Sequence, residues 1–309
     1  MDSQKKQMQE VAILYYEKKY TQQKIAQIMN LSRQTVSKLL NEAINEKIVE
    51  IKIYDPETTC KDLEEQLCKQ FKIKNAIVSG VSHSDKYLRQ LMTVKKAIDY
   101  ILTLIEAGNK KIGISWGRTI EMFIDEFPSV FTQNNTVFPL FGATDQEQSY
   151  FLSNELARNF ASKTNSKIKY AWFPYLPDCK EDCNLFKKTS YYKNLIELWD
   201  NIDIAIVGIG NSDIIQTFGK IFGYNENAIS ATGDISTHFF NTNGEFIELY
   251  ENTLCASINN LKNAKQTIAI ASGDSKVEAI IGALHTQIIN TLITDEYTAK
   301  KILKKDSQI

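Results

Sequence analysis

The feature that most constrains this chain is a twenty-residue segment, Gln22 to Asn41, with the pattern of two short helices joined by a tight turn. Ala26 is small enough for the two helix backbones to approach closely. Asn30 suits the left-handed residue that such a turn needs, and Ser32 suits the N-cap of the second helix. Five apolar residues fall where helices that cross at a steep angle bury side chains against each other: Ile25, Met29, Leu31, Val36 and Leu39. The segment therefore predicts a helix-turn-helix.

The second helix of this motif begins with polar and basic side chains. Such groups bind phosphates and base edges in a major groove. The alternative is an ordinary helical hairpin with a polar solvent face, but the agreement of apolar positions, turn and cap favours DNA binding. We predict DNA contacts from seven residues: Gln22, Ser32, Arg33, Gln34, Thr35, Ser37 and Lys38.

The excess of basic over acidic residues is confined to this N-terminal part. Residues 1–54 contain nine Lys or Arg and six Asp or Glu, a net charge of +3, whereas the whole chain has −1, so residues 55–309 carry −4. A charge of +3 is small for a nucleic-acid binder. One copy would bind DNA weakly, and we therefore expect at least a dimer that presents two recognition helices to one duplex.

The segments around the motif complete a first domain. Residues 5–18 fit a helix with Val11, Leu14 and Tyr15 on one face, and residues 48–53 alternate apolar with charged side chains, as a strand with one buried side does. We therefore expect a winged helix-turn-helix over residues 1–54. Residues 55–72 fit a linker followed by a charged helix that bridges the domains or pairs with another subunit, and a second domain spans residues 73–309.

The second domain has the pattern of an α/β fold. Short β-branched runs alternate with longer helical stretches, and most runs are apolar on both faces, as buried parallel strands are. We predict a doubly wound, mostly parallel sheet, with a hairpin around Asn243-Gly244 inserted in or appended to it. The expected strands are NAIVSG, KKIGIS, TVFPLF, KIKYAWF, IDIAIVGIG, QTIAIAS and INTLIT.

Composition excludes several classes of protein. With 43% hydrophobic and 24% charged residues, the 309-residue chain fits an ordinary soluble protein. No apolar run approaches the roughly 20 residues of a membrane helix, and the first ten residues lack the apolar core of a signal peptide, so we expect a cytoplasmic protein with no membrane partner.

The cysteines and histidines do not indicate a metal centre. Five cysteines form an odd set, and three histidines are scattered along the chain. Cys179 and Cys183 form a CxxxC pattern beside acidic residues, which suggests a redox sensor as a third function class. Because acidic neighbours raise thiol pKa values and no second ligand pair lies nearby, we expect ordinary thiols, no metal and no cofactor.

Two loops that follow predicted strands have the features of a phosphate site. In one, Gly117 lets the backbone approach an anion at a helix N-terminus, and Arg118 and Thr119 add a charge and a hydroxyl. In the other, Lys276 stands at the start of a helix, where an anion would offset its unfavourable position; the alternative is a solvated lysine paired with Asp274.

Two more segments complete the candidate site. IDIAIVGIG ends at Gly208 and Gly210, and Gly210 joins the candidate binding residues. Asp234 follows Thr232-Gly233 and either accepts hydrogen bonds from sugar hydroxyls or serves as a cap or turn residue.

Four motifs in this order resemble the SorC family of bacterial sugar-responsive transcriptional regulators. They are the helix-turn-helix region up to IVEIKI, GISWGRT, GDI followed by Phe239-Phe240, and ASGDSKVEAIIGALHTQIINTLITDEYTA. The resemblance spans nearly the whole chain. It implies an effector domain over residues 73–309, similar to sugar-phosphate isomerase and CoA-transferase folds, without retained catalysis. It also implies dimers or tetramers bound to palindromic operators.

The resemblance assigns roles to individual residues. It suggests phosphate contacts from Gly117, Arg118, Thr119 and Lys276, and hydroxyl contacts from Asp234. In some relatives that respond to deoxyribose phosphate, a lysine follows the strand that corresponds to TVFPL and can trap an aldehyde as a Schiff base. Here that position is Phe141, so no imine can form there.

We therefore expect a DNA-binding transcriptional regulator controlled by a small phosphorylated sugar. The main alternative is an active sugar-phosphate isomerase or deaminase with a DNA-binding appendage. Against it, no loop pairs a His or Glu base with a second acid, as proton abstraction requires.

Overall fold

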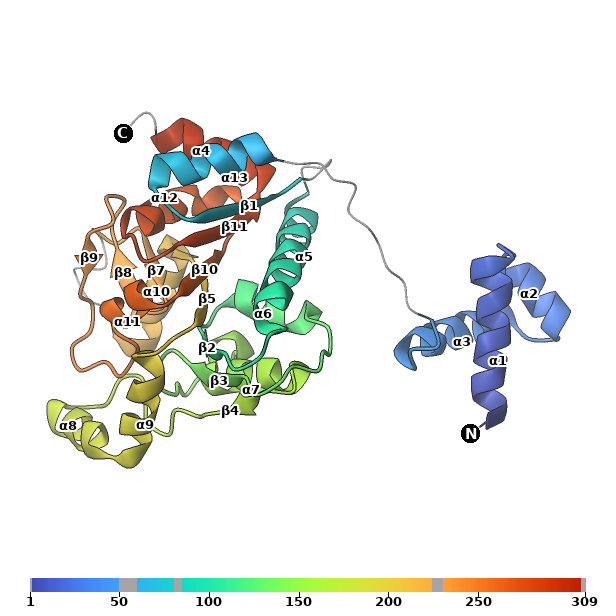
Figure 1. Ribbon diagram of the computed structural model, residues 1–309, viewed down its shortest axis with the longest axis horizontal. Coiled ribbons are helices and arrows are strands. Elements are labelled where there is room, and N and C mark those ends of the chain that lie inside the picture. Colours follow the sequence, from blue (N-terminus) through green and yellow to red (C-terminus); the bar gives the residue numbers. More distant parts are fainter. Residues whose placement is uncertain (1, 50–59, 81–84, 224–229, 307–309) are drawn as a thin grey trace. The chain divides into compact units, whose positions relative to one another are not determined.

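The computed structural model describes residues 2–49, 60–80, 85–223 and 230–306, and it divides the chain into two compact units. Unit 1 spans Met1–Thr58 and unit 2 spans Thr59–Ile309. Figure 1 shows helices α1 to α3 in the first unit and a sheet covered by helices in the second.

Unit 1 is built around the predicted helix-turn-helix. Its elements are α1 (Asp2–Ala12), a π-helical turn (Ile13–Glu17), α2 (Gln22–Met29) and α3 (Arg33–Asn45). The predicted first helix is therefore present, with a wider last turn. The core of this unit holds the side chains that the pattern placed there: Val11, Ile25, Ala26, Val36 and Leu39 are buried, and Leu14, Tyr15, Met29 and Leu31 pack against them.

The turn between α2 and α3 has the predicted chemistry. Asn30 lies in the left-handed region, with φ 54° and ψ 43°. The Ser32 hydroxyl accepts a hydrogen bond from the Thr35 backbone N–H at 3.0 Å, which satisfies one free donor at the start of α3. Both sequence predictions are confirmed.

The predicted wing strand, residues 48–53, lies mostly outside the described residues. Its first two residues, Ile48 and Val49, form a bend in which both N–H groups donate to the Ala43 carbonyl. They therefore terminate α3, and their side chains pack against the core of unit 1.

Unit 2 contains a seven-stranded sheet in the order β1-β11-β10-β5-β2-β3-β4, in which every pair of neighbours is parallel. The predicted strands are all present in it: β1 (Asn75–Ser79), β2 (Lys111–Ile114), β3 (Thr136–Pro139), β4 (Lys167–Ile168), β5 (Ile204–Gly208), β10 (Gln266–Ile270) and β11 (Thr291–Asp295). The prediction of a mostly parallel α/β sheet is confirmed.

The fourth predicted strand is much shorter than expected. The run from 167 to 173 leaves the sheet after Ile168 because the Asn154 side chain binds both the N–H and the carbonyl of Ala171. These bonds satisfy the backbone that a continued strand would have presented to its neighbour.

Helices cover both faces of this sheet. In Figure 1, α5 and α6 lie on one side of it and α12 and α13 on the other. Helix α4 packs on β1 and α13, and so belongs to unit 2. The helices are α4 (Lys61–Phe71), α5 (Lys86–Ile105), α6 (Arg118–Glu126), α7 (Ser153–Lys163), α8 (Lys180–Lys188), α9 (Ser190–Trp199), α10 (Ser212–Phe222), α11 (Ile258–Asn263), α12 (Val277–His285) and α13 (Glu296–Asp306), with short 3-10 turns at Ser149–Phe151 and Asp274–Lys276.

A second, antiparallel sheet joins β6 (Gly210–Asn211), β7 (Gly233–Ile235), β8 (His238–Phe240) and β9 (Phe246–Ile247). The predicted hairpin at Asn243-Gly244 connects β8 and β9, and Gly244 has φ +80°. A Cβ atom there would meet the His285 backbone at 2.5 Å, so only glycine fits. The sheet lies where the chain leaves β5, at the carboxyl end of the parallel strands.

Candidate functional site

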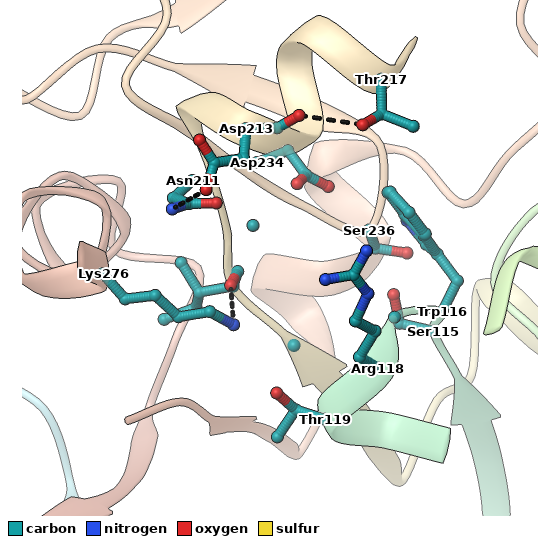
Figure 2. A pocket seen from close by; sticks show the side chains of 14 residues that line it. Ser115, Trp116, Arg118, Thr119, Asn211, Asp213, Thr217, Asp234, Ser236 and Lys276 are labelled. Atoms are coloured by element: carbon teal, nitrogen blue, oxygen red, sulfur yellow. Dashed lines mark hydrogen bonds between the residues drawn. The ribbon is translucent and has the colours of Figure 1, made fainter. Parts of the chain in front are cut away.

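One pocket lies beyond the carboxyl ends of three neighbouring strands, β2, β5 and β10, where parallel α/β sheets bind ligands. We call it the strand-end pocket. Its cavity of about 130 Å³ is lined by Ser115, Trp116, Gly117, Arg118, Thr119, Gly208, Ile209, Gly210, Asn211, Asp213, Thr217, Asp234, Ser236 and Lys276 (Figure 2). All six residues singled out from the sequence, Gly117, Arg118, Thr119, Gly210, Asp234 and Lys276, are among them.

The loop after β2 supplies one wall of the strand-end pocket. Gly117 has φ +117°, a conformation that favours glycine, and it turns the chain directly into α6. Arg118 and Thr119 are therefore the first residues of α6, next to its free N–H groups. The Arg118 Nη2 donates to the Tyr150 hydroxyl at 3.4 Å, and its guanidinium lies 5.1 Å from the centre of the Tyr150 ring.

Lys276 reaches the pocket from the turn after β10. Its side chain is half-buried, and its Nζ donates to the Ile209 carbonyl at 2.8 Å. Burial lowers the pKa of this amine to about 8; Asp234 raises it, and the positive charges of Lys86 and Arg118 lower it further. The alternative of a solvated lysine paired with Asp274 is wrong, since Asp274 pairs with Arg89 and Lys301.

Asp234 enters the pocket from β7, in register with Gly210 of β6. Its side chain is 2% exposed. The Oδ2 atom accepts a hydrogen bond from the Thr237 N–H at 3.2 Å, whereas Oδ1 has no partner among the described residues. Burial raises the pKa of this carboxyl to about 7, although the Thr237 N–H and Lys276 both lower it.

Two further buried polar atoms in this pocket lack partners within the described part of the chain. They are the Oγ atoms of Ser115 and Ser236. A buried hydroxyl or carboxylate oxygen without a hydrogen bond costs about 1–3 kcal/mol. A polar ligand that forms hydrogen bonds with these oxygens would offset this cost.

The acidic and the basic side chains lie in different parts of the strand-end pocket. Figure 2 shows the carboxylates of Asp213 and Asp234 near one end, with Lys276 and Arg118 on opposite sides below them and Thr119 at the far end. Such an arrangement can hold a ligand that carries an anion and several hydroxyl groups.

Sequence reasoning missed several lining residues. Ser115 and Trp116 lie inside the GISWGRT motif, so proximity to Gly117 was a usable signal. Asp213 and Thr217 lie on α10, and nothing in the sequence indicated which face of this helix meets the pocket. Ser236 lies in a hairpin turn where it has φ +48°, a conformation that its residue type does not predict.

Phe141, at the position where some relatives have an imine-forming lysine, is buried next to Trp116, with 6.5 Å between the ring centres. Among the described residues that line the strand-end pocket there is no histidine or glutamate. An acid-base mechanism at this site would therefore depend on Asp234, the exposed Asp213 and Lys276.

The predicted DNA-binding residues gather at the start of α3 and α2. Ser32, Arg33, Gln34, Thr35 and Lys38 are exposed, and Gln22 and Ser37 are partly exposed. Arg33 and Gln22 also line a groove with residues that sequence reasoning missed: Tyr15, Tyr16, Lys19, Tyr20, Thr21 and Gln23. Tyrosine hydroxyls and lysine amines are common phosphate contacts. Two of these tyrosines, Tyr15 and Tyr16, belong to the π-helical turn at Ile13–Glu17.

The CxxxC pair does not form a cluster. Both cysteines are free, Cys179 being exposed and Cys183 buried in α8. Within the described ranges there is no group of three or more His, Cys, Asp or Glu side chains arranged to hold a metal ion. No helix in the same ranges is long and apolar enough to cross a membrane.

Comparison with known proteins decides the family. Residues 55–304 match the family model Sugar-bind, "Putative sugar-binding domain", and residues 5–46 match Sigma-70, region 4. The chain is 31% identical over 307 residues to the sorbitol operon regulator of Klebsiella pneumoniae, covering 95% of this chain and 96% of that protein. The chain belongs to the SorC family.

Solved structures of the SorC family agree with this fold. The crystal structure of the full-length sorbitol operon regulator SorC from Klebsiella pneumoniae superposes with a TM-score of 0.75 at 28% identity, covering 96% of this chain and 98% of that one. The chain is also 26% identical to the deoxyribonucleoside regulator of Bacillus subtilis, over 98% of this chain and 99% of that protein. This SorC-family chain is thus a transcriptional regulator with a DNA-binding helix-turn-helix and a sugar-binding domain.

Proposed function

We propose that the strand-end pocket binds a small phosphorylated sugar, and that this ligand controls binding of the helix-turn-helix to a palindromic operator. The observation that carries the proposal is the pairing, in one small pocket, of two cations with a buried carboxylate oxygen that has no partner among the described residues. A neutral ligand would leave the cations unused, and an anion without hydroxyls would leave Asp234 unpaired.

The phosphate end of the ligand is assigned to the loops after β2 and β10. Gly117 allows close approach to the N–H groups at the start of α6, and the Thr119 hydroxyl is a further donor. Arg118 and Lys276 supply the two positive charges. Because charge-assisted hydrogen bonds are about twice as strong as neutral ones, these two side chains would provide most of the preference for a phosphorylated ligand.

The sugar end is assigned to the second sheet. Asp234 Oδ1 would accept a hydrogen bond from a sugar hydroxyl, and Ser115 and Ser236 are placed to bind neighbouring oxygens. Gly210 leaves its backbone open to the ligand because it has no side chain. The names of two relatives, a sorbitol operon regulator and a deoxyribonucleoside regulator, support a ligand of the sugar class.

The DNA partner is assigned to α3. We expect Arg33 and Gln34 to contact base edges and Lys38 to contact phosphate, with Gln22, Ser32, Thr35 and Ser37 at the backbone. Since the first 54 residues have a net charge of only +3, a dimer or tetramer with two heads on one palindrome is needed for tight binding.

We infer that the pocket binds its ligand without turnover. Proton abstraction from a sugar needs a base and a second group that protonates the product. Asp234, with a pKa of about 7, is suited to the first task. Lys276, the other lining group that titrates near neutral pH, is assigned here to the ligand's anion and not to the second task. An isomerase or deaminase would convert the sugar phosphate during incubation, which chromatography of the mixture would detect.

A thermal-shift screen tests the ligand class. It compares phosphorylated sugars with their unphosphorylated parents, because a ligand at 100 times its dissociation constant stabilises a protein by about 2.7 kcal/mol. Lys276→Ala and Arg118→Ala should each remove most of the preference for the phosphorylated form, and Lys300→Ala, on the surface of α13, is the control. Equal affinity of the natural chain for both forms of every sugar would refute the phosphate assignment.

A further inference from the structure

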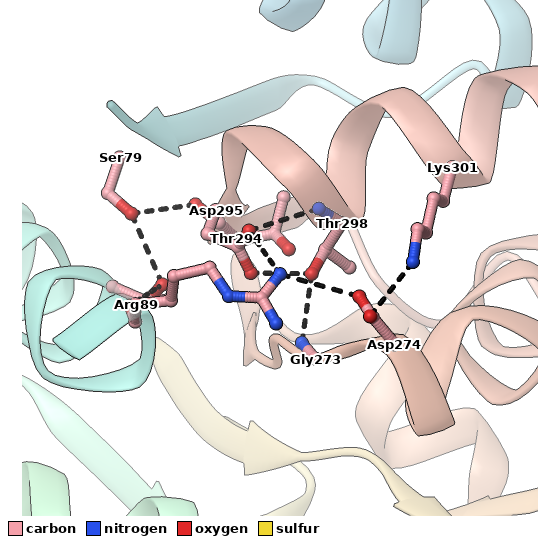
Figure 3. A network of polar contacts seen from close by, with 9 residues as sticks. Ser79, Arg89, Gly273, Asp274, Thr294, Asp295, Thr298 and Lys301 are labelled. Atoms are coloured by element: carbon pink, nitrogen blue, oxygen red, sulfur yellow. Dashed lines mark hydrogen bonds and ion pairs between the residues drawn. The ribbon is translucent and has the colours of Figure 1, made fainter. Parts of the chain in front are cut away.

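The turn that carries Lys276 is held by a network of polar contacts outside the strand-end pocket (Figure 3). We call it the Arg89 network. Its members come from α5, the turn after β10, the end of β11 and α13: Arg89, Gly273, Asp274, Asp295, Thr298 and Lys301. None of the six lines the strand-end pocket.

Arg89 is the centre of this network. Its side chain is 8% exposed, and its Nη1 lies 3.4 Å from the Asp274 carboxylate and 3.5 Å from that of Asp295. The Tyr297 ring stacks near its guanidinium, at 5.3 Å from the ring centre. One buried cation therefore joins the Lys276 turn to the end of a sheet strand.

Asp295 connects the same turn to α13 through its backbone. This carboxylate is fully buried and accepts hydrogen bonds from the Thr298 N–H at 3.0 Å and the Thr298 hydroxyl at 2.5 Å. Because the hydroxyl gives its one proton to Asp295, its lone pairs are free to accept the Gly273 N–H at 2.9 Å. Gly273 has φ +112°, a conformation that glycine adopts without strain, and the Thr298 hydroxyl fixes its N–H.

Asp274 adds a contact at the surface. Its second carboxylate oxygen pairs with Lys301 of α13 at 2.8 Å, and both side chains are about half-exposed. Burial of Asp295 without a cation would be unfavourable, and Arg89 supplies that cation while it holds Asp274. Two residues from Asp274, the same turn presents Lys276 to the pocket.

We propose that Arg89 is a positioning residue for the ligand site: through Asp274 and Asp295 it fixes the turn Gly273–Lys276, so that the Lys276 amine is held ready for the ligand's anion. This inference rests on the proposed function for its effect on ligand affinity, but not for its effect on the turn itself.

Amide hydrogen exchange on the full chain tests the effect on the turn without any ligand. The variants are Arg89→Met, which keeps the bulk of the side chain, and Lys301→Met, which removes only the surface contact. The matched control is Lys300→Met, because Lys300 is a neighbouring, half-exposed residue of α13 that pairs with Glu296 and does not contact Asp274. Peptides from β2 and β3 report whether the whole unit is destabilised.

We expect the amides of residues 273–277 to exchange about tenfold faster in Arg89→Met and severalfold faster in Lys301→Met, with β2 and β3 unchanged. Lys300→Met should behave as the natural chain. Uniformly faster exchange in every peptide would mean a general structural role, and unchanged exchange at residues 273–277 in Lys301→Met would overturn the proposal even if Arg89→Met failed to fold.

Binding of inorganic phosphate, followed by calorimetry, then separates this inference from the proposed function. If the proposed function holds, Lys276→Met should bind phosphate far more weakly than the natural chain. If the positioning role also holds, Arg89→Met should bind it about tenfold more weakly and Lys301→Met severalfold more weakly. Loss of binding in Lys276→Met together with natural binding in both network variants would overturn only the positioning role. Equal binding in Lys276→Met and the natural chain would overturn the proposed function, and the exchange result would stand.

Discussion

The Asp234 carboxyl and the Lys276 amine lie close enough in the strand-end pocket for each to shift the pKa of the other toward its charged form. Burial shifts both pKa values toward the neutral forms, and this shift is larger than the effect of the neighbouring charge. The carboxyl therefore has a pKa of about 7 and the amine one of about 8. Both groups change charge close to neutral pH, so a ligand that fixes their protonation states will bind in a pH-dependent way.

The first prediction is that affinity for a sugar phosphate falls above pH 8. The protonated Lys276 amine binds the anion, and its protonated fraction decreases as the pH rises through about 8. Well above that value the affinity should fall by about tenfold per pH unit, because binding then takes up one proton. Calorimetry from pH 7 to 9.5 with the sugar phosphate selected by the thermal-shift screen measures this change.

The control for this prediction is Lys276→Arg, whose guanidinium stays charged throughout the range. Its affinity should be lower than that of the natural chain at pH 7 but nearly constant up to pH 9.5. A natural chain with constant affinity over the same range would show that Lys276 does not contribute a titrating charge to the site.

The second prediction concerns stability without ligand. The pKa of Asp234 is about 7 in the folded chain, whereas that of an ordinary aspartate is 3.8. Between these two pH values the folded state therefore binds more protons than the unfolded state. Stability therefore falls as the pH rises through this window. Relative to Asp234→Asn, which does not titrate, the natural chain should lose about 2 to 3 kcal/mol between pH 5 and pH 8.

Urea unfolding followed by tryptophan fluorescence measures this difference, because all three tryptophans, Trp116, Trp172 and Trp199, lie in unit 2. The comparison of the two chains at each pH cancels the titrating groups that do not interact with Asp234; the pKa of Lys276 also falls in the variant, because Asp234 raises it. The same variant should also bind sugar phosphate more weakly, by roughly 1 to 3 kcal/mol, since an amide has only one acceptor oxygen and cannot accept from both the Thr237 N–H and a sugar hydroxyl. A pH-independent stability difference would mean that Asp234 is ionised or protonated in both states alike.

Much of this fold follows from local sequence patterns. The helix-turn-helix was predictable because turn, cap and apolar spacing constrain the same few residues, as Asn30 and Ser32 illustrate. The parallel strands were predictable because runs such as Ile204–Gly208 are apolar on both faces, which few other structures tolerate. The grouping of Gly117 with Lys276 followed from a general rule, since both come after strands whose carboxyl ends meet at one edge of the sheet.

The remaining features depend on contacts that are distant in the sequence. The end of β4 is set by the Asn154 side chain, and no pattern within residues 167–173 contains that information. Likewise, Arg89 lies about 185 residues before Asp274, and its position in a helix resembles that of any solvated arginine. The direction of the Asp234 side chain depends on a turn in which Ser236 and Thr237 have positive φ values, which neither residue type predicts.

The third prediction is that Ser32→Ala weakens unit 1 through the loss of a helix cap. The Ser32 hydroxyl binds the Thr35 N–H at 3.0 Å and the Thr35 hydroxyl at 2.8 Å, so it is already engaged within the protein. Its removal should lower the free energy of unfolding of unit 1 by about 1 kcal/mol, whereas Ser32→Gly should cost only a few tenths. Thermal unfolding followed by far-ultraviolet circular dichroism measures the stabilities of the two Ser32 variants, and Ser3→Ala in α1 is the control. The expected order of stability is Ser3→Ala, then Ser32→Gly, then Ser32→Ala.

The last prediction separates specific from general DNA contacts on α3. If Arg33 and Gln34 read base edges, replacing either with Ala should cost about 1 to 3 kcal/mol of operator affinity and relax the preference at one position of each half-site. Lys38→Ala should instead weaken binding to all sequences alike and reduce the slope of log affinity against log salt by about 1 for each head. Lys38 is suited to this role because it is 76% exposed and holds Glu42 only at 3.7 Å. Lys6→Ala, which removes the same charge from α1, should change the affinity little.

Fluorescence anisotropy with operator and scrambled duplexes at several salt concentrations measures all four variants. Unchanged operator affinity in Arg33→Ala, Gln34→Ala and Lys38→Ala, with folding intact, would remove α3 from the DNA interface.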